Sequence, residues 1–451
     1  MIKRQLIGKA AIAITAAMVM LSGCGKDADT DATEGSISEN TTTAESSTSS
    51  ENGTKGDTKG DDKTDGEKKP VTEKVENGFP SYTSDTSLVP TGETVRSFLT
   101  GEWINDTVGY RRPLAVMINN IEAGLPQSGI SKADVIFEGQ CEGGVTRLMA
   151  VFQDYDDIDS IGSIRSCRDY FPFLAAEYDA AYYHFGQSDF ALEFLSDPEL
   201  RAFNGMNGKY NYVRRTDRVS PHNVFTTPEN LVTAMVSNKV TTYLDEDYVA
   251  PMKFSTSSTP ADCPDGEKCI TLETGFAYNN SYFKYNEKDG LYYRYEYGEP
   301  QIDEMTGEQI AVENILFKMV PGEQYWNGSP LYLLTGEGIG LYVTNGTAQW
   351  IKWSKEVDGV NTNLGCNYTY GYGPTTYTYE DGTEVTFNQG KTWVCIYEEE
   401  DGNYIKRTYL VDYPDISSGV LRIEILSKSN EFDSLVRAIV KEIQVKTIEE
   451  W

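Results

Sequence analysis

A long polar segment, from Gly25 to about Asn77, confines the folded structure of this 451-residue chain to the residues that follow it. Nearly all of its residues are Asp, Thr, Ser, Glu, Lys and Gly. Such a composition does not bury enough apolar surface to offset the conformational entropy that folding costs. We therefore expect a disordered tether over residues 24–80, with an r.m.s. span of roughly 40 Å.

The residues before this segment have the features of an export signal. Lys3 and Arg4 precede an apolar run from about Ala10 to Leu21, which is too short to cross a bilayer comfortably. The run ends in Leu21-Ser22-Gly23-Cys24, where small residues precede a cysteine as in a bacterial lipobox. The sequence predicts a lipoprotein signal peptide over residues 1–23 and acyl chains on Cys24, which anchor the protein in the membrane at its extracytoplasmic face. An ordinary cleaved signal with a chance cysteine is the alternative.

The overall composition and charge indicate a globular protein that does not bind nucleic acid. Apolar residues make up 39% of the chain and aromatic residues 12%, which suits a globular protein, and the formal net charge is −30. This charge disfavours a nucleic-acid partner, because a duplex is itself a polyanion. No other run of eighteen apolar residues occurs, so we expect no membrane-spanning helix.

The hydrophobic pattern divides the rest of the chain into three parts. Residues 81–245 alternate apolar strand-like runs, such as Leu114 to Ile118, with helix-like runs, of which Pro228 to Ser237 has Thr227 as its N-cap. Residues 246–400 contain mostly strand-like runs, including a hairpin around Lys288-Asp289-Gly290. Residues 401–451 form a C-terminal extension. The expected fold is α+β, with an α/β-like first domain followed by a mostly β second domain.

Seven cysteines include the one in the lipobox. Cys263 and Cys269 flank Pro264-Asp265-Gly266, a turn that favours a local disulfide in an oxidising compartment, although two free thiols are the alternative. The pairing of the remaining four stays open: Cys141, Cys167, Cys366 and Cys395. The spacing suggests no zinc site, and we expect no metal and no cofactor.

Two histidines are the first candidates for chemistry, because the chain has no others. His184 ends a strand-like run beside a Gly turn, and His222 follows Asp217, Arg218 and Pro221. With Glu142 and Asp217 they form a candidate acid–base set. The alternative is that each histidine is a structural residue.

Arginines beside Gly and Ser form a second candidate set. A guanidinium at such a turn suits an anion, because it pairs bidentately with carboxylate or phosphate. The predicted ligand-binding residues are Arg147, Arg165, Arg168, Arg218 and Asn223. We expect the first three arginines and both histidines to line one cleft, although pairing of the arginines with Glu138 and Glu142 as scaffold is the alternative.

Several enzyme classes lack their motifs. The chain contains no G-x-S-x-G, no H-E-x-x-H and no Walker loop. Its acidic run at 154–159 departs from the EF-hand template, with Ile158 at the fifth position and Arg165 at the twelfth. Paired carboxylates for glycoside hydrolysis stay open.

Taken together, several motifs resemble the YerB-type lipoprotein family of Gram-positive bacteria, a family of unknown function. The resemblance implies a lipid-anchored envelope protein with two linked domains, and it implies no activity or catalytic residues. Residues 361–372 look inserted, and the chain continues past the family pattern after about residue 400. The motifs are Arg112-Pro113-Leu114-Ala115-Val116-Met117-Ile118, Pro126-Gln127-Ser128-Gly129, Ala133-Asp134, Glu142-Gly143-Gly144-Val145-Thr146-Arg147, Arg165-Ser166-Cys167-Arg168, Asp217-Arg218-Val219-Ser220-Pro221-His222-Asn223, Trp353-Ser354-Lys355 and Gly390-Lys391-Thr392-Trp393.

Three functions follow as hypotheses. The favoured one is an envelope binding module for an anionic cell-wall component or a protein partner. The second is a cell-wall glycan or peptide hydrolase or transferase that uses His184, His222 and a carboxylate. The third is a structural lipoprotein whose polar residues hold the two domains together. Convergence of the candidate residues favours the first two hypotheses, and dispersal favours the third.

Overall fold

The computed structural model describes residues 79–84, 86–364 and 367–399, and the backbone of three strands, 72–74, 405–412 and 420–427. The predicted signal peptide, Cys24, most of the predicted tether, Cys366 and most of the C-terminal extension lie outside the described residues.

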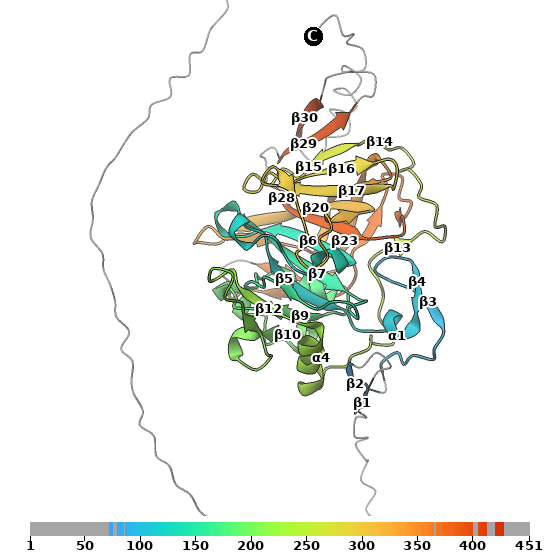
Figure 1. Ribbon diagram of the computed structural model, residues 1–451. Helices are drawn as coiled ribbons and strands as arrows, with labels where there is room; N and C mark the ends of the chain where they lie inside the picture. The colour runs from blue at the N-terminus through green and yellow to red at the C-terminus, as the bar shows by residue number, and fades with distance from the viewer. Residues whose placement is uncertain are drawn as a thin grey trace, which may run out of the picture. The chain divides into compact units, whose positions relative to one another are not determined.

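A twelve-stranded sheet runs through the described part of the chain (Figure 1). In the first region, β5 and β6 both run antiparallel to β7, whereas β9 runs parallel to both β5 and β10. The apolar runs predicted as strands there are confirmed. These strands are β5 (Leu114–Asn119), β6 (Val135–Gln140), β7 (Thr146–Phe152) and β9 (Ala181–His184). The short strand β10 (Ala202–Asn204) was not predicted.

One late strand joins the two regions of the chain within this sheet. β28 (Thr392–Glu399) pairs in parallel with β6 on one side and with β20 (Asn314–Gln324) on the other. A single sheet therefore contains strands from both predicted domains, and the domain boundaries themselves stay predictions. The sheet continues through β22 (Gly336–Thr344), β23 (Thr347–Lys355) and β14 (Glu267–Lys268), with β21 (Pro330–Tyr332) and β26 (Thr376–Thr378) paired to β20 and β23.

A seven-stranded sheet contains the predicted hairpin. β16 (Tyr282–Asn286) pairs antiparallel with β17 (Leu291–Glu296), and Gly290 in the turn has a φ of 77°, where a side chain is strained. Two strands of the C-terminal extension are the last two of this sheet. Its other strands are β15 (Thr271–Glu273), β18 (Glu299–Pro300), β19 (Ala311–Val312), β29 (Ile405–Asp412) and β30 (Val420–Ser427).

Short strands form the remaining sheets. The three-stranded one is antiparallel, in the order β11, β12, β8, and it borders the candidate site. These strands are β8 (Ile161–Gly162), β11 (Val213–Arg214) and β12 (Val224–Thr226), and the pairs are β1 (Thr72–Lys74) with β2 (Pro80–Tyr82), β3 (Thr94–Arg96) with β4 (Trp103–Asn105), β13 (Lys253–Phe254) with β27 (Thr386–Phe387), and β24 (Gly359–Asn361) with β25 (Tyr368–Tyr370).

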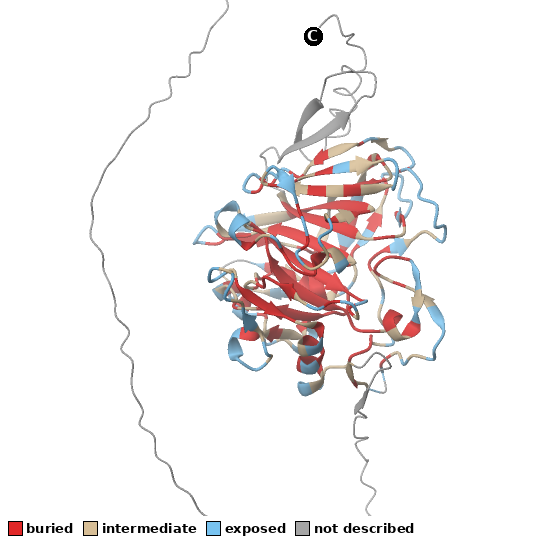
Figure 2. Ribbon diagram, viewed as in Figure 1, coloured by how far each residue is buried: buried red, intermediate tan, exposed pale blue. Residues whose placement is uncertain are grey.

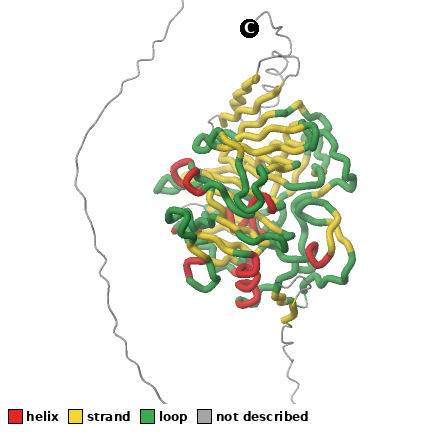
Figure 3. Tube along the Cα trace, in the orientation of Figure 1, coloured by secondary structure: helices red, strands yellow, loops and turns green. Residues whose placement is uncertain are grey.

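Helices are few and short (Figure 3). The longest described helix, α4 (Pro228–Ser237), has the predicted bounds, and the Thr227 hydroxyl accepts from the Asn230 amide at its first turn. The others are α1 (Asp106–Gly109), α2 (Phe171–Ala176), α3 (Asp189–Leu192) and five single 3₁₀ turns, 122–124, 130–132, 142–144, 198–200 and 205–207.

The mostly β character of the prediction is confirmed, but an α/β-like first domain is not clearly shown. Its first three sheet strands are antiparallel, and no long helix connects them. None of the described helices combines the length and the apolar character needed to cross a bilayer.

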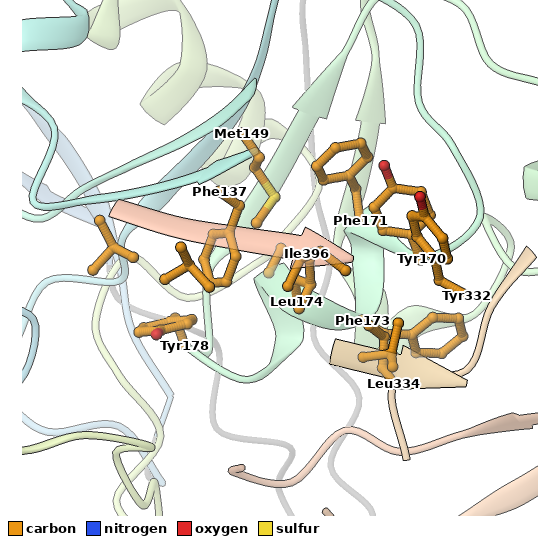
Figure 4. Close-up of a cluster of buried hydrophobic side chains, with 14 of the residues drawn as sticks. Phe137, Met149, Tyr170, Phe171, Phe173, Leu174, Tyr178, Tyr332, Leu334 and Ile396 are labelled. Atoms are coloured by element: carbon orange, nitrogen blue, oxygen red, sulfur yellow. The ribbon is translucent and has the colours of Figure 1, made fainter. Parts of the chain in front are cut away.

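The central strands of the sheet are buried on both faces (Figure 2). All six residues of β5 are buried; Leu114, Val116 and Ile118 pack in one hydrophobic cluster, whereas Ala115 and Met117 pack in a second. Successive side chains of a strand point to opposite faces, so each cluster covers one face. Figure 4 shows the second cluster, where helix α2 packs its aromatic residues near strand β28.

The same two clusters explain why the predicted disulfide is absent. Cys263 and Cys269 are free, buried thiols, and this corrects the prediction of a bridge between them. Cys263 packs in the second cluster, whereas Cys269 packs in the first. The two thiols therefore pack against different sets of buried side chains. Burial raises the pKa of each thiol to about 12, which keeps both protonated.

Candidate anion-binding site

Two of the predicted arginines are brought together by adjacent strand ends. Arg147 is the second residue of β7 and lies opposite Asn119, the last residue of β5, in the strand register. Arg165 follows β8, and its amide donates to the Met117 carbonyl of β5 at 3.1 Å. The segment from Arg165 to Arg168 therefore crosses the end of β5 near Arg147. We call Arg147, Arg165 and Arg168 the arginine cluster.

The electrostatics of Arg165 show that the three guanidiniums are close neighbours. Burial, together with the charges of Arg147 and Arg168, lowers the pKa of Arg165 to about 10. Its Nη1 donates to the Pro221 carbonyl at 3.1 Å, but its buried Nε has no acceptor. Within the described residues, no carboxylate lies in ion-pair distance of Arg165.

Arg168 differs from Arg165 because it has an acidic partner. Its Nη2 forms an ion pair with Glu142, and its Nη1 donates to the Cys167 carbonyl at 2.8 Å. Burial opposes the charge of Arg168, but the thiol of Cys141 and the Glu142 carboxylate raise its pKa overall. Glu142 also accepts from the Ser329 hydroxyl at 3.3 Å. The Glu142–Arg168 pair matches the scaffold alternative for these two residues.

Arg147 is bound to neutral oxygen only. Its Nη1 donates to the carbonyl of Ser166, and the residue is 8% exposed. No described carboxylate forms an ion pair with it. Only one of the three guanidiniums, that of Arg168, has a described carboxylate partner. The cluster therefore carries an excess of positive charge in partly buried surroundings.

His222 lies beside this cluster. Asn119 donates from Nδ2 to His222 Nδ1 at 2.9 Å, so the neutral ring carries its proton on Nε2. Burial, followed by the charge of Arg165, lowers the pKa of His222. A neutral ring with an Nε2–H donor next to Arg165 adds a hydrogen-bond donor for an anion.

The structure places His184 in the core. Its Nδ1–H donates to the Gly186 carbonyl at 2.7 Å, and its ring stacks on Tyr182 with centroids 5.4 Å apart. Burial lowers the pKa of His184 to about 4, so the ring is neutral near pH 7. None of the described contacts joins His184 to His222. Its burial and its hydrogen bond to a backbone carbonyl match the structural alternative for His184.

The other three predicted residues gather around a different arginine. Asp217 pairs with Arg215, which also pairs with Glu304 of the second region at 2.8 Å. Arg218 pairs with Glu304 at 3.1 Å, and the amide of Asn223 donates to the Arg215 carbonyl at 3.0 Å. Asp217, Arg218 and Asn223 therefore each have a partner here. None of the described contacts joins them to the arginine cluster.

Some site residues escaped the sequence analysis. Asn119, the last residue of β5, was not predicted as a site residue. A polar side chain at the end of a buried strand is the sequence signal that could have indicated it. Ser329 lies far along the chain, and only the fold brings it to Glu142. No group of three or more His, Cys, Asp or Glu suited to a metal occurs in the described residues.

The fold and the site together define a mostly β protein with an arginine-rich site and no described metal cluster. Two family models match the chain: "Protein of unknown function (DUF3048) N-terminal domain" over residues 99–241, and the corresponding C-terminal domain over residues 272–394. The chain belongs to this YerB-like family.

Two relatives give the extent of the similarity. A Bacillus subtilis (strain 168) protein named "Putative lipoprotein YerB" is 28% identical over 325 residues, which cover 70% of this chain and 90% of the relative. The crystal structure of YerB protein from Bacillus subtilis is 26% identical, has a TM-score of 0.57, and matches 68% of this chain and 98% of that one. These descriptions name no ligand and no reaction.

Proposed function

We propose that this chain is a lipid-anchored extracytoplasmic protein that binds an anionic component of the cell wall through its arginine cluster. The anchor rests on Cys24 and the small residues before it, and on the name of a relative as a lipoprotein. The binding role rests on the geometry around Arg165.

One observation carries the proposal: Arg165 is partly buried between two like charges and has no described carboxylate partner. A buried guanidinium without a counter-charge is costly, since desolvation and like-charge repulsion both oppose it. A bound carboxylate or phosphate offsets both costs, because it supplies the missing counter-charge. The chain's net charge of −30 repels anions at long range, so a local cluster is needed to select one.

The contacts support the binding module more than the hydrolase. A catalytic pair needs its histidines within reach of a shared substrate. His184 is 1% exposed and has its Nδ1 proton committed to a backbone carbonyl, while His222 lies at the arginine cluster. Only His222 is placed to contact a ligand of that cluster.

Soluble cell-wall fragments titrated calorimetrically into the parent and Arg165→Ala proteins test the proposal. We expect the loss of Arg165 to weaken binding about tenfold, which is the effect of one charge-assisted hydrogen bond of about 1.4 kcal/mol. Arg215→Ala is the matched control, because Arg215 is already paired with Asp217 and Glu304. Equal binding by all three proteins, or no binding by the parent, would reject the proposal.

A further inference from the structure

An exposed tryptophan lies at the tip of the β20–β21 hairpin. Trp326 is 88% exposed, more than any other large apolar side chain among the described residues. The turn is closed by the Tyr325 amide, which donates to the Ser329 carbonyl at 2.9 Å, and the Gly328 amide, which donates to Tyr325 at 2.8 Å. An indole held in water by an ordered turn costs hydration free energy that binding would recover.

The residues beside Trp326 are packed and hydrogen-bonded. The ring of Tyr325 stacks on Phe190 with centroids 3.6 Å apart and planes at 6°, and its hydroxyl donates to Asp169 at 2.8 Å. Trp326 itself meets Phe190 edge-on, with centroids 6.4 Å apart. Because the turn and the neighbouring rings are already ordered, stacking of a ligand on the indole has to order the Trp326 side chain alone.

The same hairpin touches the arginine cluster. Ser329 donates to Glu142, and Glu142 is the ion-pair partner of Arg168. Asp169, which accepts from Tyr325, directly follows Arg168 in the chain. Two separate contacts therefore fix the hairpin tip beside the Glu142 side of the cluster, so an aromatic face and a set of cationic donors lie on neighbouring segments.

We propose that Trp326 and the arginine cluster form one binding surface for an anionic saccharide, whose pyranose ring stacks on the indole and whose carboxylate or phosphate pairs with Arg165. A pyranose has an apolar C–H face that packs on an aromatic ring and polar edges that stay wet. A ligand with both a stacking ring and an anionic group matches this pair of features. This inference rests on the proposed function and names the ligand class for the same site.

Three probes separate the two contributions: tetragalacturonate, which is anionic and pyranose-based; cellotetraose, which is neutral; and inorganic phosphate, which has no ring. Each is titrated into the parent, Trp326→Ala, Trp326→Tyr and Trp103→Ala proteins. Trp103 is the control, since it is also exposed, at 63%, but packs under Arg96 on the β3–β4 hairpin. Adenosine monophosphate serves as a competitor that carries a stacking base.

We expect Trp326→Ala to weaken tetragalacturonate binding about tenfold, to leave phosphate binding within twofold, and to be partly rescued in Trp326→Tyr. The inference is overturned if Trp326→Ala binds tetragalacturonate as the parent does, if cellotetraose binds equally well, or if the nucleotide displaces the saccharide more strongly than phosphate does. Arg165→Ala distinguishes the two proposals. If Arg165→Ala leaves the binding of phosphate and of tetragalacturonate unchanged, the proposed function fails. If Arg165→Ala weakens binding and Trp326→Ala does not, only the saccharide inference is rejected.

Discussion

Arg294 of β17 places its Nη2 2.9 Å from Oε2 of Glu138 in β6, and both side chains are fully buried. Glu138 also accepts from Asn120, Thr146 and Asn279 at 3.0, 2.9 and 3.1 Å. The Arg294 guanidinium lies over the Trp393 ring at 4.1 Å. This ion pair links the twelve-stranded sheet to the seven-stranded sheet, across the two regions that the sequence separates.

Loss of one partner of this pair should be strongly destabilising. Arg294→Met leaves Glu138 buried without a counter-charge, and we expect the free energy of unfolding to fall by about 3–5 kcal/mol. Denaturant unfolding measures this change. The double variant Arg294→Met with Glu138→Gln should recover part of the loss, because it removes the orphan charge; a double variant less stable than the single one would contradict the account.

The buried carboxyl of Asp169 predicts a pH dependence of stability. Burial raises its pKa from 3.8 to about 7. A group whose pKa is raised on folding stabilises the fold fully below its unfolded pKa, and this contribution is lost as pH rises through about 7. We expect the unfolding midpoint to fall between about pH 4 and pH 7, and to level off above pH 7, where the carboxyl is ionised in both states.

Asp169→Asn should flatten this part of the pH profile, since the amide oxygen still accepts from Tyr325 but does not titrate. Asp157→Asn is the control, because Asp157 is exposed. An unchanged slope in Asp169→Asn would show that other groups cause the pH dependence.

Cys263 and Cys269 should remain reduced. Cys263 and Cys269 pack in different clusters, so we expect both to react with an alkylating reagent once the exported protein is unfolded without reductant. Mass mapping checks this. A peptide pair joined by a Cys263–Cys269 bridge would restore the pairing that the turn between them suggested.

The lipid anchor is tested at Cys24. Cys24→Ala removes the thiol that accepts the lipid, and we expect the protein to leave the membrane fraction for the soluble one. Recovery of the variant in the membrane fraction at the parent's level would disprove the anchor.

Short-range patterns predicted the strands and helix α4 well, because apolar periodicity and an N-cap act within a few residues of the chain. The hairpin at Gly290 was predictable for the same reason. The position of β28 was not, since parallel pairing with β6 joins residues more than 250 apart, such as Trp393 and Ile136. The α/β-like layout was expected from alternation alone, which does not report strand direction.

The candidate site was predicted in part. Arg147, Arg165, Arg168, Glu142 and His222 converge, because each lies at the end of a buried strand or in a segment that crosses one. The other three residues pair elsewhere: Asp217 with Arg215, Arg218 with Glu304, and Asn223 with the Arg215 carbonyl. Arg294 was missed although it occupies an inward position of an alternating strand, where a charged residue indicates a buried partner.

The central claim is that the arginine cluster binds an anion. The most direct test is thermal unfolding of the parent and Arg165→Gln proteins in increasing inorganic phosphate at constant ionic strength. An anion that binds only the folded state raises the unfolding midpoint. The account predicts that phosphate raises the midpoint of the parent but not that of Arg165→Gln, and that without phosphate the two differ by no more than about 1 kcal/mol in stability. A variant destabilised by about 3–5 kcal/mol, with phosphate having no effect on the parent, would contradict it and leave Arg165 as a structural residue.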